Sequence, residues 1–241
     1  MGETRPMDLK TLLTAVEREG RALLAAAERD PSARIEHCPD WDASGLVDHI
    51  AGVWSFMAAQ VEAASSDKPT RPDPDDPSTA SDRLSHLVAL LASVEPTAPC
   101  WNWCPEEGRT ASWVVRRMAH ENNIHRWDAE NAVGDPDPLD ADLAHDGVDE
   151  ILDVAWRHLL SGPVGGYPSS TLHLHRTDGD GEWLLSSAGE QLVVGHEHAK
   201  GDAAARGTAS DLNLLVWGRR QPTLEVFGDE AVLDAWLALA P

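Results

Sequence analysis

The sequence predicts an α+β protein: a four-helix bundle with a linking helix over residues 1–162, followed by a small α+β domain over residues 163–241. Two observations predict the bundle, namely four segments whose apolar residues recur at helical intervals and the two longer connections between them. A third observation predicts the second domain, because the apolar residues begin to alternate after residue 166. The change of period places the domain boundary near residue 163.

The predicted helices of the first domain begin at capping residues and end at helix breakers. Asp8 can cap the first helix, and Asp30-Pro31 ends it. Two irregular stretches separate later helices, a polar, proline-rich loop or lid over 65–77 and a second loop over 96–108. The bundle helices are expected at about 9–28, about 43–64, from Ser81 onwards and at about 110–131, and the linking helix at about 140–160.

The second domain is expected to combine a small sheet with two helices. Residues 171–175 alternate between apolar and polar, and Asp178-Gly179-Asp180-Gly181 is a hairpin signal between this strand and the next. The predicted strands are 171–175, 182–186, 191–194 and 223–227, and the predicted helices lie at about 209–217 and 230–239.

The chain is strongly acidic, with 41 Asp and Glu against 19 Lys and Arg and a net charge of −22 when His is neutral. Such a charge repels phosphate backbones and anionic lipids, so we expect neither a nucleic-acid partner nor a membrane partner. The sequence has no signal-peptide pattern and no long apolar run. Its three cysteines, Cys38, Cys100 and Cys104, form no disulfide framework, which favours a reducing, cytoplasmic location. We expect a monomer or a weak dimer.

The fourth predicted helix contains a pair of residues suited to metal binding. Glu121 and His125 are four residues apart, so they lie on one helix face, about 6 Å apart along the axis. His120 points to another face, because five residues on a helix correspond to about 140° of rotation. His49, on the second predicted helix, supplies a third ligand if the two helices face each other. A solvated Glu/His pair and a core histidine are the alternatives.

Several stretches resemble the mycothiol-dependent maleylpyruvate isomerase family, in the expected order along nearly the whole chain. Asp40 departs from the family's Cys-Pro-Gly-Trp pattern, and neither the 65–77 loop nor the Trp101/Trp103 segment matches the family. The matching stretches are Cys38-Pro39-Asp40-Trp41, residues 46–53, 117–121, 125–130 and 146–150, Gly207-Thr208-Ala209-Ser210-Asp211-Leu212 and Trp217-Gly218-Arg219.

This resemblance implies a DinB-like bundle followed by a domain similar to sterol carrier proteins. It implies zinc ligands at His49, Glu121 and His125, and a functional arginine at Arg219, with Arg220 as the second candidate. A solvated surface position is the alternative for Arg219.

Asp128 is placed to orient the His125 imidazole, being three residues further along the same helix. The alternative for Asp128 is a surface pair with Arg126 or Arg220.

The implied function is that of a zinc-dependent enzyme using mycothiol as a thiol cosubstrate. An activated thiolate can add to an electrophilic double bond and leave again, which isomerises it, or it can remain attached, which is thiol transfer. A non-enzymatic carrier or regulator of an apolar ligand is the rival hypothesis, and metal-dependent hydrolysis lacks a recognisable general base. Cys38 and the Cys100/Cys104 pair are weaker candidates for thiol or metal chemistry, and a buried apolar role is favoured for Cys38.

Overall fold

The computed structural model describes residues 7–104, 108–159, 166–221 and 223–241. The chain divides into two compact units, Met1–Pro138 and Leu139–Pro241. The first unit is helical and the second combines helices with one sheet, so the predicted α+β class is confirmed.

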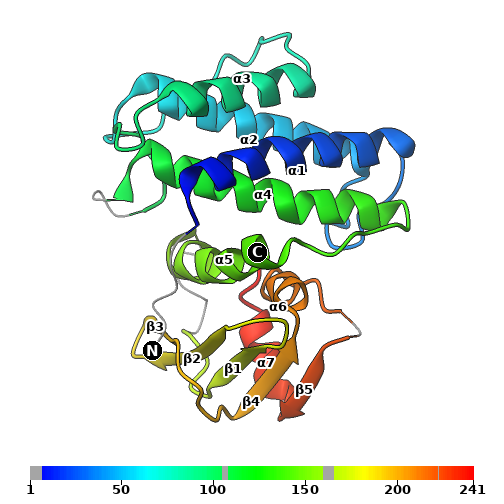
Figure 1. Ribbon diagram of the computed structural model, residues 1–241, viewed down its shortest axis with the longest axis vertical. Coiled ribbons are helices and arrows are strands. Elements are labelled where there is room, and N and C mark those ends of the chain that lie inside the picture. The colour runs from blue at the N-terminus through cyan, green and yellow to red at the C-terminus, as the bar shows by residue number, and fades with distance from the viewer. Residues whose placement is uncertain (1–6, 105–107, 160–165, 222) are drawn as a thin grey trace. The chain divides into compact units, whose positions relative to one another are not determined.

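Four helices lie alongside one another in the first unit (Figure 1). Three of their N-termini are capped by side chains: Asp8 accepts from the Thr11 amide, Asp42 from the Gly45 amide, and Thr79 forms a capping box with Asp82. The third helix therefore begins one residue before Ser81. The helices are α1 Leu9–Arg29, α2 Ala43–Ala63, α3 Ala80–Ser93 and α4 Ala111–Ala132.

Buried polar side chains fix how α1, α2 and α4 pack. The Asn122 amide on α4 accepts from the Trp54 indole at 2.8 Å and donates to the Val16 carbonyl at 2.8 Å. Arg126 donates to Glu19 on α1 at 2.9 Å, and both side chains are buried. Because an unsatisfied buried polar group costs about 1–3 kcal/mol, these bonds favour one arrangement of the three helices. That arrangement sets α2 against α4.

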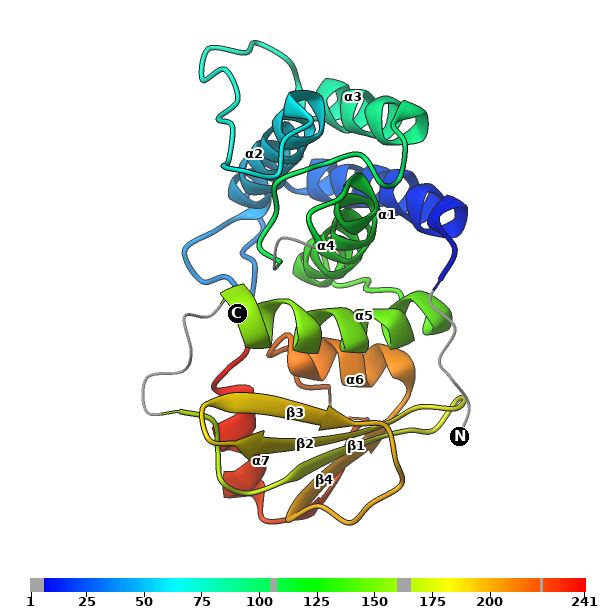
Figure 2. The ribbon, with the colours of Figure 1, turned by 90° about the vertical axis from the view of Figure 1, so that its left-hand side faces the viewer.

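The second unit contains a five-stranded sheet in the order β3-β2-β1-β4-β5 (Figure 2). β1 pairs with β2 through the predicted hairpin, and β4 lies parallel to β1. The strands are β1 Leu172–Arg176, β2 Glu182–Ala188, β3 Gln191–Gly195, β4 Ala203–Gly207 and β5 Glu225–Gly228, and the helices are α5 Ala141–Asp153, α6 Ala209–Val216 and α7 Glu230–Leu237. A π-helical turn, Ala155–Leu159, follows α5.

The sequence-based prediction missed β4. Its residues Ala203, Ala204 and Ala205 have low strand propensity, and only pairing with β1 and β5 places them in the sheet.

The predicted domain boundary also differs from the structure. The position after residue 162 lies outside the described residues, and the division falls between Pro138 and Leu139, so α5 belongs to the second unit. The Leu139 amide donates to Ser210 at 2.9 Å, and Asp149 accepts from the Trp183 indole at 2.6 Å. A helical period shows that α5 is a helix, but it cannot show which unit its apolar face packs against.

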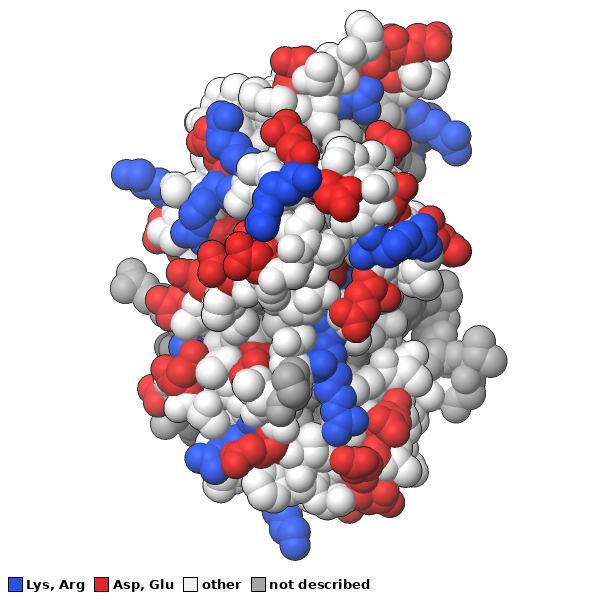
Figure 3. Space-filling view, turned by 90° about the vertical axis from the view of Figure 1, so that its right-hand side faces the viewer, with Lys and Arg blue, Asp and Glu red and all other residues white. Residues whose placement is uncertain are grey.

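Within the described part of the chain, we find no helix with the length and apolar character of a membrane-spanning segment. On the face in Figure 3, acidic and basic side chains are interspersed.

Candidate metal centre

His49, Glu121 and His125 come together between α2 and α4, and each offers a ligand atom within 4.8 Å of the other two. The His49 Nε2 lies 3.4 Å from Glu121 Oε1, and the His125 Nε2 lies 3.5 Å from the same oxygen. The two imidazole rings meet edge to face, with centroids 5.3 Å apart. The predicted facing of the second and fourth helices is therefore present in the structure.

The Glu121 carboxylate is held ionised by its neighbours. Burial alone would raise its pKa, but the Arg117 guanidinium and hydrogen bonds from His125 and His49 keep it well below its usual range. Arg117 is itself buried and donates to Oε2, which leaves Oε1 turned toward the two imidazoles. The Arg117 guanidinium thus pairs with one oxygen of Glu121, and the other oxygen faces the two histidines.

His125 has a second partner on its own helix. Its Nδ1 lies 3.0 Å from Asp128 Oδ2, and both side chains are buried. Burial lowers the pKa of His125, but the hydrogen bonds to Asp128 and Glu121 outweigh it and raise that pKa to about 9. Asp128 is buried and therefore not part of a surface pair, and its role in orienting the His125 ring stays a prediction. Arg126 pairs with Glu19 and Glu130 instead, and Arg220 with Glu230.

Two neighbours of the group were not among the candidate residues. Trp41 stacks on His49 with ring centroids 4.6 Å apart, and Arg117 contacts Glu121. The spacing of Arg117 and Glu121, four residues apart on one helix, could have indicated their contact. Trp41 belongs to the family-like Cys38-Pro39-Asp40-Trp41 stretch before α2, but no local pattern indicates its contact with His49, because that contact depends on the fold.

The donor set fits a divalent transition metal. Two imidazoles and one carboxylate are ligands of catalytic zinc sites, where three protein ligands leave the fourth position open. Hydrogen bonding of the far nitrogen of His125 and the far oxygen of Glu121 matches the outer partners that orient metal ligands. His120 is buried on α4 and lies outside the group, as predicted from its angular position.

Arg219 follows α6 in the second unit. Its side chain donates to the Trp217 carbonyl, and its guanidinium carbon lies 5.8 Å from the centroid of the Trp217 ring. At 3 % exposure the residue is buried, so the alternative of a solvated surface arginine is wrong. Its proposed role in turnover stays a prediction.

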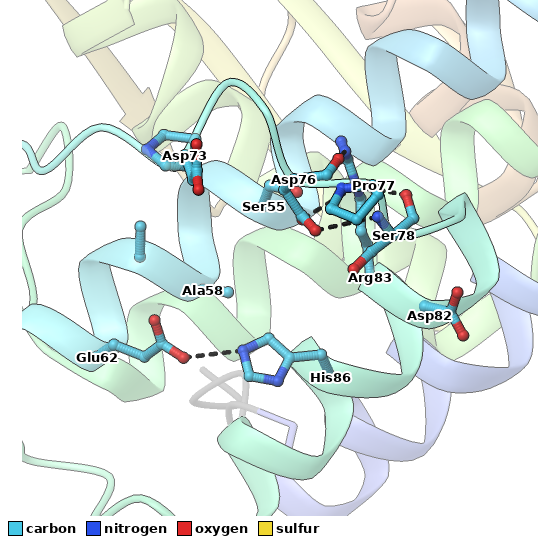
Figure 4. Close-up of a pocket in the computed structure, with 12 residues that line it drawn as sticks. Ser55, Ala58, Glu62, Asp73, Asp76, Pro77, Ser78, Asp82, Arg83 and His86 are labelled. Atoms are coloured by element: carbon cyan, nitrogen blue, oxygen red, sulfur yellow. Dashed lines mark hydrogen bonds and ion pairs between the residues drawn. The ribbon is translucent and has the colours of Figure 1, made fainter.

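The loop over residues 65–77 borders a pocket of about 310 Å³ between α2 and α3. Figure 4 shows its lining, which includes an exposed pair between His86 and Glu62 at 2.9 Å. None of the three residues of the metal group lines it.

The other unmatched segment, around Trp101 and Trp103, packs against Phe56 on α2 and Trp113 on α4. Phe56 is two helical turns, about 10 Å, from His49. The four aromatic rings form a half-buried cluster, and two of them, Phe56 and Trp113, are on the same two helices as the metal group.

No disulfide joins Cys38, Cys100 and Cys104, and none of the three belongs to a metal-ligand group among the described residues. Cys100 is fully buried, and burial raises the pKa of its thiol to about 12. Cys38 is half-buried in the turn that precedes α2.

The fold and the site define a two-unit protein with a candidate divalent-metal centre in its helical unit. Two family models match, the mycothiol maleylpyruvate isomerase N-terminal domain over residues 13–130 and the MDMPI C-terminal domain over residues 142–235. The chain therefore belongs to the mycothiol maleylpyruvate isomerase family.

Solved structures show the same fold. A crystal structure of the mycothiol-dependent maleylpyruvate isomerase is 13 % identical, with a TM-score of 0.58 over 91 % of this chain and 93 % of that one. A histidine-to-alanine mutant of that enzyme is 12 % identical, with the same TM-score and coverage. No curated protein sequence matches this chain.

Proposed function

We propose that this chain is a zinc-dependent enzyme that uses mycothiol, and that a thiolate activated at the bundle site adds to an electrophilic small molecule. The observation that carries the proposal is the convergence of His49, Glu121 and His125, with ligand atoms within 4.8 Å of one another. Membership of the mycothiol maleylpyruvate isomerase family supports the thiol and the isomerase reaction.

Each residue of the group has a defined task in this proposal. His49, Glu121 and His125 hold the ion, and the 32 % exposure of the His49 side chain leaves that side of the group open to a ligand. A bound zinc ion supplies the charge that keeps a coordinated thiol deprotonated at neutral pH. Arg117 fixes the Glu121 carboxylate and Asp128 fixes the His125 ring, so the three ligands are preorganised.

The reaction needs no protein nucleophile. The thiolate sulfur forms a bond to one carbon of an electron-poor double bond, and the π electrons move onto the electron-withdrawing group. Rotation about the resulting single bond, followed by departure of the sulfur with its electron pair, converts the cis form to the trans form. If a proton reaches the new carbanion first, the thiol stays attached, and the outcome is thiol transfer.

The test combines metal analysis with turnover. The parent protein, His49→Ala, Glu121→Ala and His125→Ala are compared for zinc content and for conversion of maleylpyruvate and other electrophiles, with and without mycothiol. Each substitution should remove one equivalent of zinc and the thiol-dependent turnover. His120→Ala is the matched control, because His120 is on the same helix but outside the group.

Two results would contradict the proposal. Full metal content in Glu121→Ala and His125→Ala would show that the ion binds elsewhere, and turnover that is independent of any thiol would exclude the thiolate chemistry. The mass of the product separates the two reactions, because isomerisation leaves it unchanged and transfer adds the thiol.

A further inference from the structure

A second group of histidines and a glutamate lies in the C-terminal unit and shares no residue with the bundle group. It consists of His173, His175, Glu182 and His198, each with a ligand atom within 4.8 Å of the other three. Among the described residues, this group and the bundle group are the two sets of three or more His, Cys, Asp or Glu side chains that meet this criterion.

Three imidazoles converge on one carboxylate in this group. His173 Nε2 contacts Glu182 Oε2, while His175 Nδ1 and His198 Nδ1 lie 2.7 Å and 3.0 Å from Glu182 Oε1. The three rings pack edge to face, with centroids 5.6–6.1 Å apart. All three nitrogens therefore point to one small volume around Glu182.

The strand geometry explains this convergence. His173 and His175 are two residues apart on β1, so both point to one face of the sheet, while the buried Leu172 and Leu174 point to the other. Glu182 on β2 is the cross-strand partner of His175 in the register of the hairpin. His198 comes from the segment between β3 and β4 and approaches the same face.

The donor set matches zinc. Imidazole nitrogens and carboxylate oxygens bind Zn²⁺ at about 2.0–2.2 Å, so neighbouring ligand atoms of a tetrahedral site lie about 3.3 Å apart. The nitrogen–oxygen distances around Glu182, 2.5–3.0 Å, are slightly shorter than this, and the 79 % exposed side chain of His198 can move outward to admit an ion. A pocket of about 300 Å³, lined by His173 and His198, gives an ion access from solvent.

We propose that His173, His175, Glu182 and His198 form a second zinc site in this protein. Four protein ligands fill a tetrahedral shell, which is the mark of a structural rather than a catalytic site. The ion would join β1, β2 and the segment that carries His198, so its binding stabilises the C-terminal unit. This proposal is independent of the metal role of the bundle group.

The test uses the full-length, tag-free chain with the bundle group removed by His49→Ala and His125→Ala. After chelation, loading with Zn²⁺ and gel filtration, this protein should retain about one zinc ion per chain. Adding His173→Ala and His175→Ala should reduce the content to about zero. Loading with Co²⁺ instead should produce the visible absorption of a tetrahedral site in the first protein and not in the second.

Two further variants make the test independent of folding defects. His198→Ala changes an exposed side chain, and Glu182→Gln keeps the shape of the residue, so both should fold while binding zinc more weakly. His196→Ala is the matched control, because His196 lies two residues from His198, is half-exposed and is outside the group. Circular dichroism verifies the fold of each variant.

Two outcomes of the zinc measurements would overturn the proposal. The proposal is overturned if the folded His49→Ala/His125→Ala protein retains no zinc, in which case the group is a hydrogen-bonded cluster around a carboxylate. It is also overturned if one equivalent persists after His173→Ala and His175→Ala. A rise in melting temperature on adding Zn²⁺ that depends on His198 but not on His196 confirms the stabilising role. Loss of zinc from the bundle variants of the parent protein bears only on the proposed function.

Discussion

The two histidine–glutamate groups are assembled by different secondary structure, the first by helices and the second by strands. In the bundle, Glu121 and His125 are four residues apart on one helix, and His49 comes from another. In the sheet, His173 and His175 are two residues apart on one strand, and Glu182 comes from its hairpin partner. Each spacing is the natural same-face period of its element.

The groups differ in what surrounds the carboxylate and in the number of ligands. Glu121 is shared between Arg117 and two imidazoles, and Asp128 supports one of those rings. Glu182 is contacted by three imidazoles, one of them from an exposed segment. A three-ligand, supported group is suited to a bound ion with an open position, and a four-ligand group to a closed one.

The largest expected effect is that of His125 on the free energy of unfolding of the metal-free protein. The pKa of His125 is raised from 6.5 to about 9, so its protonated form contributes stability that is fully present below pH 6.5 and is lost as the pH rises through about 9. In the presence of a chelator, the stability difference between the parent and His125→Gln should shrink by up to about 3 kcal/mol over this range. Urea unfolding at several pH values measures it. A difference that does not vary with pH would contradict the prediction.

The next largest effect is expected at Arg219, which tests whether the C-terminal unit contributes to turnover. A charge-assisted hydrogen bond to a substrate carboxylate amounts to about 1.5–3 kcal/mol, so Arg219→Ala should lower thiol-dependent turnover roughly 10–100-fold while zinc content is unchanged. Arg219→Lys should recover part of the activity. The exposed neighbour Arg220→Ala is the control. Turnover like that of the parent in folded Arg219→Ala would exclude the role.

A smaller effect, on zinc affinity, is expected from substituting Asp128, which contacts His125 in the bundle group. Outer partners of metal ligands affect metal affinity or activity by about 10–100-fold, and asparagine keeps an oxygen that can face the His125 ring. Asp128→Asn should therefore lower zinc affinity by about 10-fold, the low end of that range. Competition with a chromophoric chelator measures the affinity. Unchanged affinity and turnover would show that Asp128 does not tune the site.

The smallest effect is expected where a histidine and a glutamate meet without further ligands. His86 and Glu62 form an exposed pair at 2.9 Å, and exposed pairs contribute about 0–1 kcal/mol. His86→Ala should leave zinc content unchanged and alter the free energy of unfolding by no more than about 0.5 kcal/mol. A loss of zinc in this variant would mean that proximity of one histidine and one glutamate suffices, and the contrast between the groups would fail.

The sequence alone determined most of the helical elements and the pairing of Glu121 with His125. A helical period and a capping residue are local signals, so α1, α2 and α4 lie close to where the sequence predicts them. The alternation around His173 and the hairpin signal likewise determined β1 and its pairing with β2. Matches to the family motifs assigned His49 to the same group as the helical pair.

Only the tertiary structure decided the features that depend on contacts between distant residues. The alanine-rich β4 has no local strand signal and exists because it pairs with β1, and α5 belongs to the second unit because of its packing there. Trp41 reaches His49 from a loop, and His198 reaches Glu182 from the segment between two strands. Local periods specify which face of an element a side chain occupies, but the partner on that face is chosen by the free energy of packing the whole unit.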